Sequence, residues 1–178
     1  MEVSLYTENE LNDVVAVYVE AFSKSEGENE GLVIGELAKA LLETTPSQDI
    51  YCFVAKQHQQ IIGVIIFSRM IFEEPLQSFI LSPVAVNSLS QKQGVGQQLI
   101  TEGIEYLKKQ GVTLVFTYGD PAYYSKVGFD VITERQIKAP QPLSFPHGWL
   151  AQSLSGDDIP ILTGDSICVA ALNKAQYW

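Results

Sequence analysis

The stretch Leu81–Leu99 reads LSPVAVNSLSQKQGVGQQL, an apolar run that contains a proline and leads into a glycine pair at the start of a predicted helix. Proline donates no hydrogen bond to a sheet, so a central strand tolerates it at a bulge or where one neighbouring strand has left. Pro83 therefore predicts a strand whose neighbour departs. The backbone groups freed by that departure need partners, and an extended ligand with its own amides can supply them as an added strand would.

The glycines predict that the backbone after this strand closely approaches another group. Gly94 and Gly96 permit such an approach, and the free N–H groups and dipole of a helix N-terminus form an anion site. The charge pattern supports this interpretation. No Asp or Glu occurs from Pro75 to Thr101, although 21 of the 178 residues are acidic, and Lys92 is the only charged residue there. Glutamines stand where acidic residues normally favour a first helical turn, as if the position were kept for an external anion.

Other glycine-rich loops fit this stretch less well. A Walker loop needs Gly-Lys-Ser/Thr, and here Gly96 is followed by Gln97. A dinucleotide-binding fingerprint needs a small residue where Leu99 stands. Close packing of a helix on a strand is the alternative explanation for the glycine pair taken alone.

The pattern on either side predicts alternating strands and helices. A capping box of Thr7 and Glu10 starts a first helix, and Gly111 ends the helix that follows the glycine pair. A strand, a helix and a strand then fit the length of a βαβ unit. The full set of expected elements is a strand at Val3–Tyr6, a helix to about Phe22, a polar loop over Ser23–Gly31, a second helix from about Val33 that Pro46 closes, a hairpin of Ile50–Gln57 and Ile61–Phe72 joined at His58–Gln60, strands at Ser78–Val86 and Val112–Tyr118, a short helix, and strands at Phe129–Ile137 and Ser166–Leu172.

The size and composition predict one domain. The 178 residues are 46% hydrophobic, enough for one sizeable core, so residues 1–178 are expected to form a single domain. Residues 138–165 hold four of the eight prolines and are expected to be mostly loop before the last strand. No apolar run approaches the ~20 residues of a membrane span, and the N-terminus is acidic, so we expect a cytoplasmic protein without membrane contact.

Charge and cysteine content exclude several functions. The net charge of −10 repels phosphate backbones and anionic lipids, which argues against nucleic acid as a partner. Cys52 and Cys168 lie in separate apolar runs, and only two histidines occur, so no metal-ligand spacing exists and no metal is expected. Two buried, reduced cysteines are the expectation.

Two segments resemble a known family. VAVNSLSQKQGVGQQL is similar to the acyl-CoA-binding motif of the GCN5-related N-acetyltransferase (GNAT) superfamily, with Gln91, Gly94 and Gly96 at its defining places. GDPAYYSKVGF resembles the family's Tyr-x-x-x-Gly-Phe segment, which gives Tyr124 and Gly128–Phe129. With an N-terminal EAF and a tryptophan-containing tail, the chain is most similar to the YhbS-like bacterial subgroup.

The chain also departs from the family pattern. Ser88 and Ser90 replace a proline and an aromatic residue that are common in the wider family, and Lys92 replaces a frequent glycine. The Asn often found after the following strand is absent.

The resemblance implies a mixed α/β fold, in which a mostly antiparallel, twisted sheet with splayed fourth and fifth strands has helices on both faces. It implies acetyl-CoA as co-substrate, with the pantetheine arm on the backbone of one strand and the pyrophosphate on the amides of the following loop. Tyr124 would stabilise or protonate the departing thiolate, whereas Tyr123 is expected to pack in the core. The cofactor-binding residues it implies are Val84, Ala85, Val86, Gln91, Lys92, Gln93, Gly94, Val95 and Gly96.

Three functions remain open at this point. The first is an acyltransferase (EC 2.3.1 type) that acetylates a primary amine of a small molecule or peptide by direct attack. The second is a non-catalytic acyl-CoA-binding or sensing module, and the third is an enzyme that acylates charged transfer RNA, against which the net charge argues. The acceptor, the acyl length and the choice between monomer and homodimer are left open.

Residues around the acceptor are less well defined. A cationic amine is expected because several carboxylates fall on segments near the acceptor mouth of this fold, but no general base is named. His147 and Trp149 are candidates for lining the acceptor pocket, with anchoring of a long loop as the alternative for Trp149. The carboxylates, each expected to be a solvated surface group, are Glu28, Glu30, Glu73 and Glu74.

Overall fold

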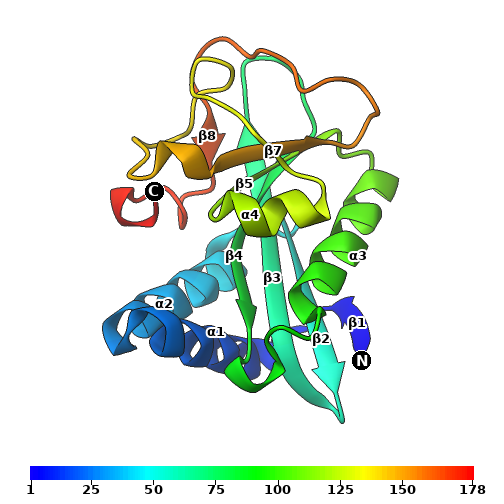
Figure 1. Cartoon of the computed structure of the whole chain (residues 1–178), viewed down its shortest axis with the longest axis vertical. Coiled ribbons are helices and arrows are strands. Elements are labelled where there is room, and N and C mark those ends of the chain that lie inside the picture. Colours follow the sequence, from blue (N-terminus) through cyan, green and yellow to red (C-terminus); the bar gives the residue numbers. More distant parts are fainter. The chain divides into compact units, whose positions relative to one another are not determined.

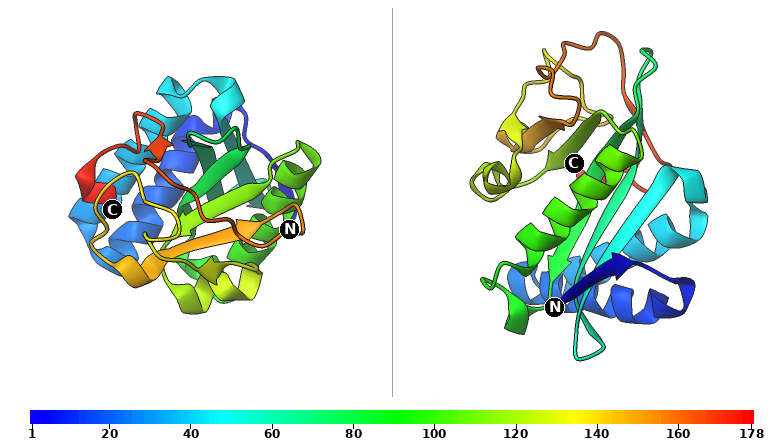
Figure 2. Two further views of the ribbon diagram at one scale, coloured as in Figure 1. Left: turned by 90° about the horizontal axis from the view of Figure 1, so that it is seen from above. Right: turned by 90° about the vertical axis from the view of Figure 1, so that its right-hand side faces the viewer.

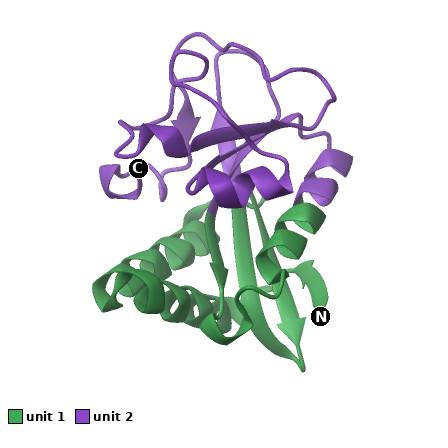
Figure 3. Ribbon diagram, in the orientation of Figure 1, with its two compact units in different colours: residues 1–67, 83–103 green, residues 68–82, 104–178 purple.

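The computed structural model describes residues 1–178, which divide into two compact units (Figure 3). Unit 1 consists of Met1–Phe67 and Pro83–Gly103, and unit 2 consists of Ser68–Ser82 and Ile104–Trp178. Two strands and one helix contribute residues to both units.

The chain forms four α-helices and eight strands (Figure 1). The helices are α1 (Leu11–Glu26), α2 (Glu28–Thr44), α3 (Val95–Lys109) and α4 (Pro121–Tyr124). The strands are β1 (Glu2–Leu5), β2 (Ile50–Gln57), β3 (Gln60–Ile71), β4 (Ser78–Val86), β5 (Leu114–Tyr118), β6 (Asp130–Val131), β7 (Trp149–Ser153) and β8 (Ile167–Cys168). Their order in the sheet is β1-β2-β3-β4-β5-β7-β6, with β8 paired to β3. The parallel pair β4–β5, joined through α3, confirms the predicted βαβ unit in a mostly antiparallel sheet.

In unit 1, helices α1 and α2 lie side by side and are separated by Gly27 alone (Figure 1). The prediction of a polar loop over Ser23–Gly31 is therefore wrong. These residues are mostly exposed and carry no apolar period, although they form helix readily once Gly27 supplies a turn with a φ of 105°. Gly31 lets the two helices meet, because a β-carbon there would lie 2.6 Å from the carbonyl oxygen of Val19.

The central strand β3 of unit 1 is buried on both faces. A β-carbon on Gly63 of β3 would lie 2.8 Å from the Leu99 side chain, so this face carries α3. Val64 and Ile66 point to the opposite face and are fully buried. Figure 2 shows α1 and α2 covering that face. The predicted hairpin between β2 and β3 is confirmed, since His58 and Gln59 both have positive φ, as a two-residue turn requires.

Unit 2 contains a strand that the sequence analysis missed. Strand β7 pairs antiparallel with β5, from Leu114↔Ser153 to Tyr118↔Trp149. Trp149 is fully buried, its ring stacks on Phe116 with centroids 5.2 Å apart, and its indole N–H donates to the carbonyl of Ile137 (2.9 Å). The structural alternative for Trp149, an anchor of the long loop, is therefore confirmed.

Two strands predicted in unit 2 are much shorter than expected. The strand at 129–137 is reduced to β6, and the strand at 166–172 is reduced to β8. Ile132 and Ile137 are buried without belonging to a strand, so their apolar character reflects packing of a loop.

Candidate functional site

The ladder between β4 and β5 ends where Pro83 predicts a departure. The last register pair is Leu81↔Thr117. The Thr117 hydroxyl donates to the carbonyl of Leu81 (2.9 Å), and the buried Tyr18 hydroxyl of α1 donates to the carbonyl of Pro83 (2.8 Å). Buried carbonyls need partners, and at this point of β4 two side-chain hydroxyls supply them.

The predicted cofactor-binding loop forms a turn at residues 91–94 of unit 1, between β4 and α3. Residues 91–94 are exposed, and both Lys92 (φ 61°) and Gly94 (φ 83°) adopt the left-handed conformation. No atom lies within 4 Å of a β-carbon placed on Gly94. The Gln91 side chain folds back and donates to the carbonyl of Val86 (3.0 Å). Left-handed residues in such a turn orient backbone N–H groups into an anion-binding concavity.

The start of α3 adds further free amides. The first hydrogen bond into the helix runs from the N–H of Gln98 to the carbonyl of Gly94 (3.0 Å). The amides of Val95, Gly96 and Gln97 therefore have no acceptor within the helix. No acidic residue lies in this first turn, so loop and helix together fit an anionic group such as a pyrophosphate.

The first residue of the EAF segment quoted in the sequence analysis, Glu20, reaches this turn, although the sequence analysis gave it no role. Glu20 of α1 accepts hydrogen bonds from both the N–H (3.0 Å) and the hydroxyl of Ser88, on the 3₁₀ turn that follows β4. The acid-free segment therefore receives a carboxylate from a helix 68 residues earlier. Spacing along the chain carries no signal for such a contact.

Tyr124 lies in unit 2 at the end of α4. The predicted cap is confirmed, since the Asp120 side chain accepts from the N–H of Ala122 (2.9 Å) and proline occupies the first helical turn. The Tyr124 ring lies against Gly119, where a β-carbon would come within 2.7 Å of it, and it meets the Phe129 ring edge to face. Gly128 adopts φ 93° to end the turn, which accounts for the Gly-Phe part of the motif.

The hydroxyl of Tyr124 is part of a chain of hydroxyl groups. Burial raises the pKa of Tyr124 to about 12, and a hydrogen bond with Thr117 partly opposes this increase. The Thr117 hydroxyl also donates to the carbonyl of Leu81, so it links Tyr124 to the backbone of β4. Tyr123 is half-buried, and its ring meets that of Tyr124 edge to face with centroids 5.1 Å apart.

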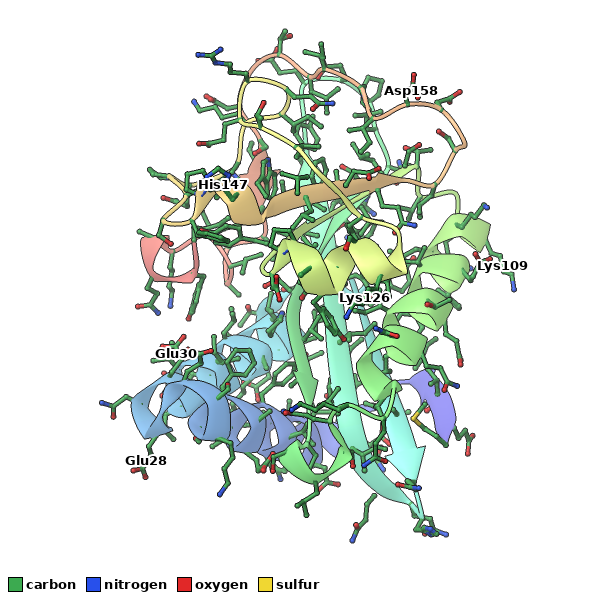
Figure 4. All side chains as sticks on the ribbon, in the orientation of Figure 1. Glu28, Glu30, Lys109, Lys126, His147 and Asp158 are labelled. Atoms are coloured by element: carbon green, nitrogen blue, oxygen red, sulfur yellow. The ribbon has the colours of Figure 1, made fainter.

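Three of the four carboxylates considered near the acceptor are exposed surface groups. Glu28 and Glu30 lie in the first turn of α2 and extend in different directions (Figure 4). Both are exposed, as is Glu73. Glu74 differs, because its Oε2 atom is shielded from solvent and has no hydrogen-bond partner. His147 is exposed on a 3₁₀ turn of unit 2.

The cysteines are free and buried, as predicted. Burial raises the pKa of both thiols, that of Cys168 to about 11. No group of three or more His, Cys, Asp or Glu side chains is arranged to hold a metal ion, and none of the helices is long and apolar enough to cross a membrane.

Comparison with known proteins relates this geometry to a family. The family model described as acetyltransferase (GNAT) domain matches residues 2–132. The chain is 33% identical over 139 residues to the uncharacterized N-acetyltransferase YjhQ of Escherichia coli K12, a match that covers 75% of this chain and 76% of YjhQ. It is 36% identical over 84 residues to the uncharacterized N-acetyltransferase YhbS of the same strain, covering 47% of this chain and 50% of YhbS.

Two solved structures share the fold over nearly the whole chain. The crystal structure of E. coli YhbS in complex with CoA superposes with a TM-score of 0.80 at 24% identity, over 97% of this chain and 92% of that one. A GNAT family acetyltransferase from Brucella melitensis in complex with acetyl-CoA superposes with a TM-score of 0.76 at 24% identity, over 96% and 97% of the two chains.

Proposed function

The chain belongs to the acetyltransferase (GNAT) domain family, and from this premise we propose that it transfers an acetyl group from acetyl-CoA to a primary amine of a small molecule or peptide. The observation that carries the proposal is the turn at residues 91–96. Its left-handed residues and the unpaired amides at the start of α3 suit the pyrophosphate of coenzyme A. The backbone of Val84–Val86, just before this turn, is our candidate for pairing with the pantetheine amides. The complexes of YhbS with CoA and of the Brucella enzyme with acetyl-CoA support this choice of ligand.

The proposed chemistry is direct transfer of the acetyl group from coenzyme A to the amine. The nitrogen of a neutral amine attacks the thioester carbonyl carbon, and a backbone N–H of β4 polarises the carbonyl oxygen. As the new C–N bond forms, the C–S bond breaks and coenzyme A leaves as a thiolate. The attacking nitrogen loses its proton to water, and the thiolate is stabilised or protonated.

Tyr124 is the candidate group for the departing thiolate. Its pKa of about 12 lies well above a typical thiol pKa of about 8.5, so full proton transfer would be uphill by roughly 5 kcal/mol. We therefore assign Tyr124 a hydrogen-bonding role toward the thiolate, with solvent as the final proton source. This role requires the O–H of Tyr124, which is hydrogen-bonded to Thr117 in the resting protein, to point toward the thiolate.

A non-catalytic acyl-CoA-binding module is the alternative. The turn at residues 91–96 would serve a binding module equally well, because it holds only the non-reacting part of the ligand. The two functions differ in turnover. Thiol release from acetyl-CoA, measured over a panel of amines, separates them: release that depends on an amine supports the transferase, whereas tight binding without release with any amine supports the module.

The anion site itself is tested by a matched pair of variants. Gly94→Asp and Gly94→Asn have nearly the same shape, both enter open space, and both must adopt φ 83°, so they differ mainly in charge. A carboxylate about 5 Å from a phosphate costs about 1 to 3 kcal/mol, or roughly 5- to 150-fold in Kd. Calorimetry should therefore show that coenzyme A binds the Asp variant at least about 5-fold more weakly than the Asn variant. Equal affinities would contradict the assignment.

A further inference from the structure

We propose that Glu20 is a positioning residue for coenzyme A, holding the turn after β4 so that the amides of residues 91–96 face the cofactor. The inference rests on the proposed function and gives a role to a residue that lies outside the cofactor-binding and tyrosine-containing segments, in the N-terminal EAF. It starts from the hydrogen bonds that Ser88 donates to Glu20, one from the backbone N–H at 3.0 Å and one from the hydroxyl.

This contact fixes both the backbone and the side chain of one residue. The two carboxylate oxygens of Glu20 each accept one hydrogen bond from Ser88, which leaves little freedom to rotate. Bonds to a charged acceptor are stronger than those between neutral groups. Ser88 lies only three residues before Gln91, so its position determines where the anion-binding turn begins.

Helix α1 holds this region at two points. Tyr18 donates to the carbonyl of Pro83, and Glu20, two residues later on the same helix, holds Ser88. Val84–Val86, the candidate for pairing with pantetheine, lies between these two anchors. The N–H of Asn87 also donates to the carbonyl of Ile62 on β3 (2.8 Å), so the turn is tied to a helix and to the sheet at once.

The charge of Glu20 is unfavourable for a site that binds an anion. Like charges raise each other's energy, and the segment from 75 to 101 contains no acidic residue of its own. A carboxylate here would weaken anion binding unless its hydrogen bonds contribute more by ordering the turn than its charge costs. This balance predicts that neutralising Glu20 lowers affinity for coenzyme A, although simple electrostatics predicts the reverse.

The test is calorimetric titration of Glu20→Gln with coenzyme A. Gln has one acceptor oxygen in place of two and no charge, so the Ser88 hydroxyl would have to accept from its NH2 group and both bonds to a charged acceptor would be lost. We expect coenzyme A to bind roughly 10-fold or more weakly, since bonds to charged groups are the stronger class. Glu26→Gln removes the same charge from an exposed position at the end of α1 and should leave the affinity unchanged.

Variants of Ser88 separate positioning from a general loss of structure. Ser88→Ala removes the hydroxyl and should weaken binding of coenzyme A, whereas Ser88→Thr retains both donors and should bind like the wild-type protein. The double variant Glu20→Gln/Ser88→Ala should bind no more weakly than Glu20→Gln alone, because both changes remove the same contact. Amide exchange of residues 88–96 in the ligand-free protein should be faster in Glu20→Gln than in Glu26→Gln.

Three outcomes would decide against parts of this reasoning. Tighter binding by Glu20→Gln would show that the charge outweighs the anchor, and affinity unchanged with a lowered Tm would reduce Glu20 to a structural role. Either result overturns the positioning proposal while wild-type binding of coenzyme A keeps the proposed function. If the wild-type protein does not bind coenzyme A, the proposed function fails first.

Discussion

Replacing Lys92 with glycine should stabilise the protein and at the same time weaken its affinity for coenzyme A. Lys92 has a φ of 61° in the anion-binding turn, a conformation in which a β-carbon crowds the following carbonyl oxygen. The side chain is exposed, so no packing compensates for this strain. The wider family often has glycine here, and the structure supplies a physical reason.

The stability change can be worked out from the backbone. Left-handed geometry costs a non-glycine residue about 1 to 2 kcal/mol, and the entropy of glycine in the unfolded chain opposes the gain by about 0.5 to 1 kcal/mol. The net increase in the free energy of unfolding is about 0 to 1.5 kcal/mol, which raises Tm by up to about 6 °C in a chain of this size.

The affinity should change in the opposite direction because the variant loses the only charge between residues 75 and 101. An exposed ion pair contributes about 0 to 1 kcal/mol, so Kd for coenzyme A should rise by up to about 5-fold. The difference should shrink as salt is added, because salt screens exposed charges.

The matched control is Lys92→Ala, which loses the charge and keeps the β-carbon. Thermal denaturation should rank Lys92→Gly above Lys92→Ala and the wild-type protein, while calorimetry at low salt should show both variants binding coenzyme A more weakly than wild type. If Lys92→Gly is no more stable than Lys92→Ala, the turn is not strained as described. If neither variant loses affinity, Lys92 does not face the phosphates.

Three further predictions concern the chemistry. Tyr124→Phe should lower turnover roughly 10- to 10⁴-fold with little change in Tm, and since the pKa of Tyr124 is about 12, no limb of the wild-type pH–rate profile between about pH 6 and 10 should disappear in this variant. Cys52 and Cys168 should resist a thiol reagent at pH 8 until the protein is denatured, because both are buried. Burial raises the pKa of Cys168 to about 11, so the contribution of this thiol to the free energy of unfolding is fully present below about pH 9 and is lost as the pH rises to about 11. For a cationic acceptor, kcat/KM should fall as the Debye length decreases from about 30 Å at 0.01 M salt to about 10 Å at 0.1 M, and a neutral hydroxylamine analogue should show no such effect.

Features that depend on a few neighbouring residues could be predicted from the sequence. The strand Ser78–Val86 matches β4 residue for residue. Gly111 ends α3 with a φ of 82° and donates to the carbonyl of Lys108 (3.1 Å), while Val112 donates to that of Leu107 (3.1 Å). This is the glycine cap that the pattern indicates, and it needs no information from the rest of the chain.

Features that depend on tertiary pairing could not be predicted in the same way. Strand β7 is five residues long, follows a proline and a glycine, and becomes a strand by pairing with β5. The prediction of a loop around Gly27 is wrong for a different reason. The last turn of α1 and the first turn of α2 face solvent, so their polar residues lack the apolar period by which a helix is recognised, although Glu, Lys and Ser are compatible with a helix.

The same distinction between local and long-range features applies to the candidate site. The predictions of a turn leading into a helix at residues 91–96 and of a capped helix at Tyr124 match the structure, because both features are local. The freed backbone of β4, however, was expected to need an external ligand, and three of its carbonyls already accept hydrogen bonds from side chains: Leu81 from Thr117, 36 residues away, Pro83 from Tyr18, 65 residues away, and Val86 from Gln91. The part of the β4 backbone left for a ligand therefore begins after Pro83 and excludes the carbonyl of Val86. This is why mutations of Tyr18 and Thr117 should act through the position of β4, whereas mutations in the turn should act on coenzyme A directly.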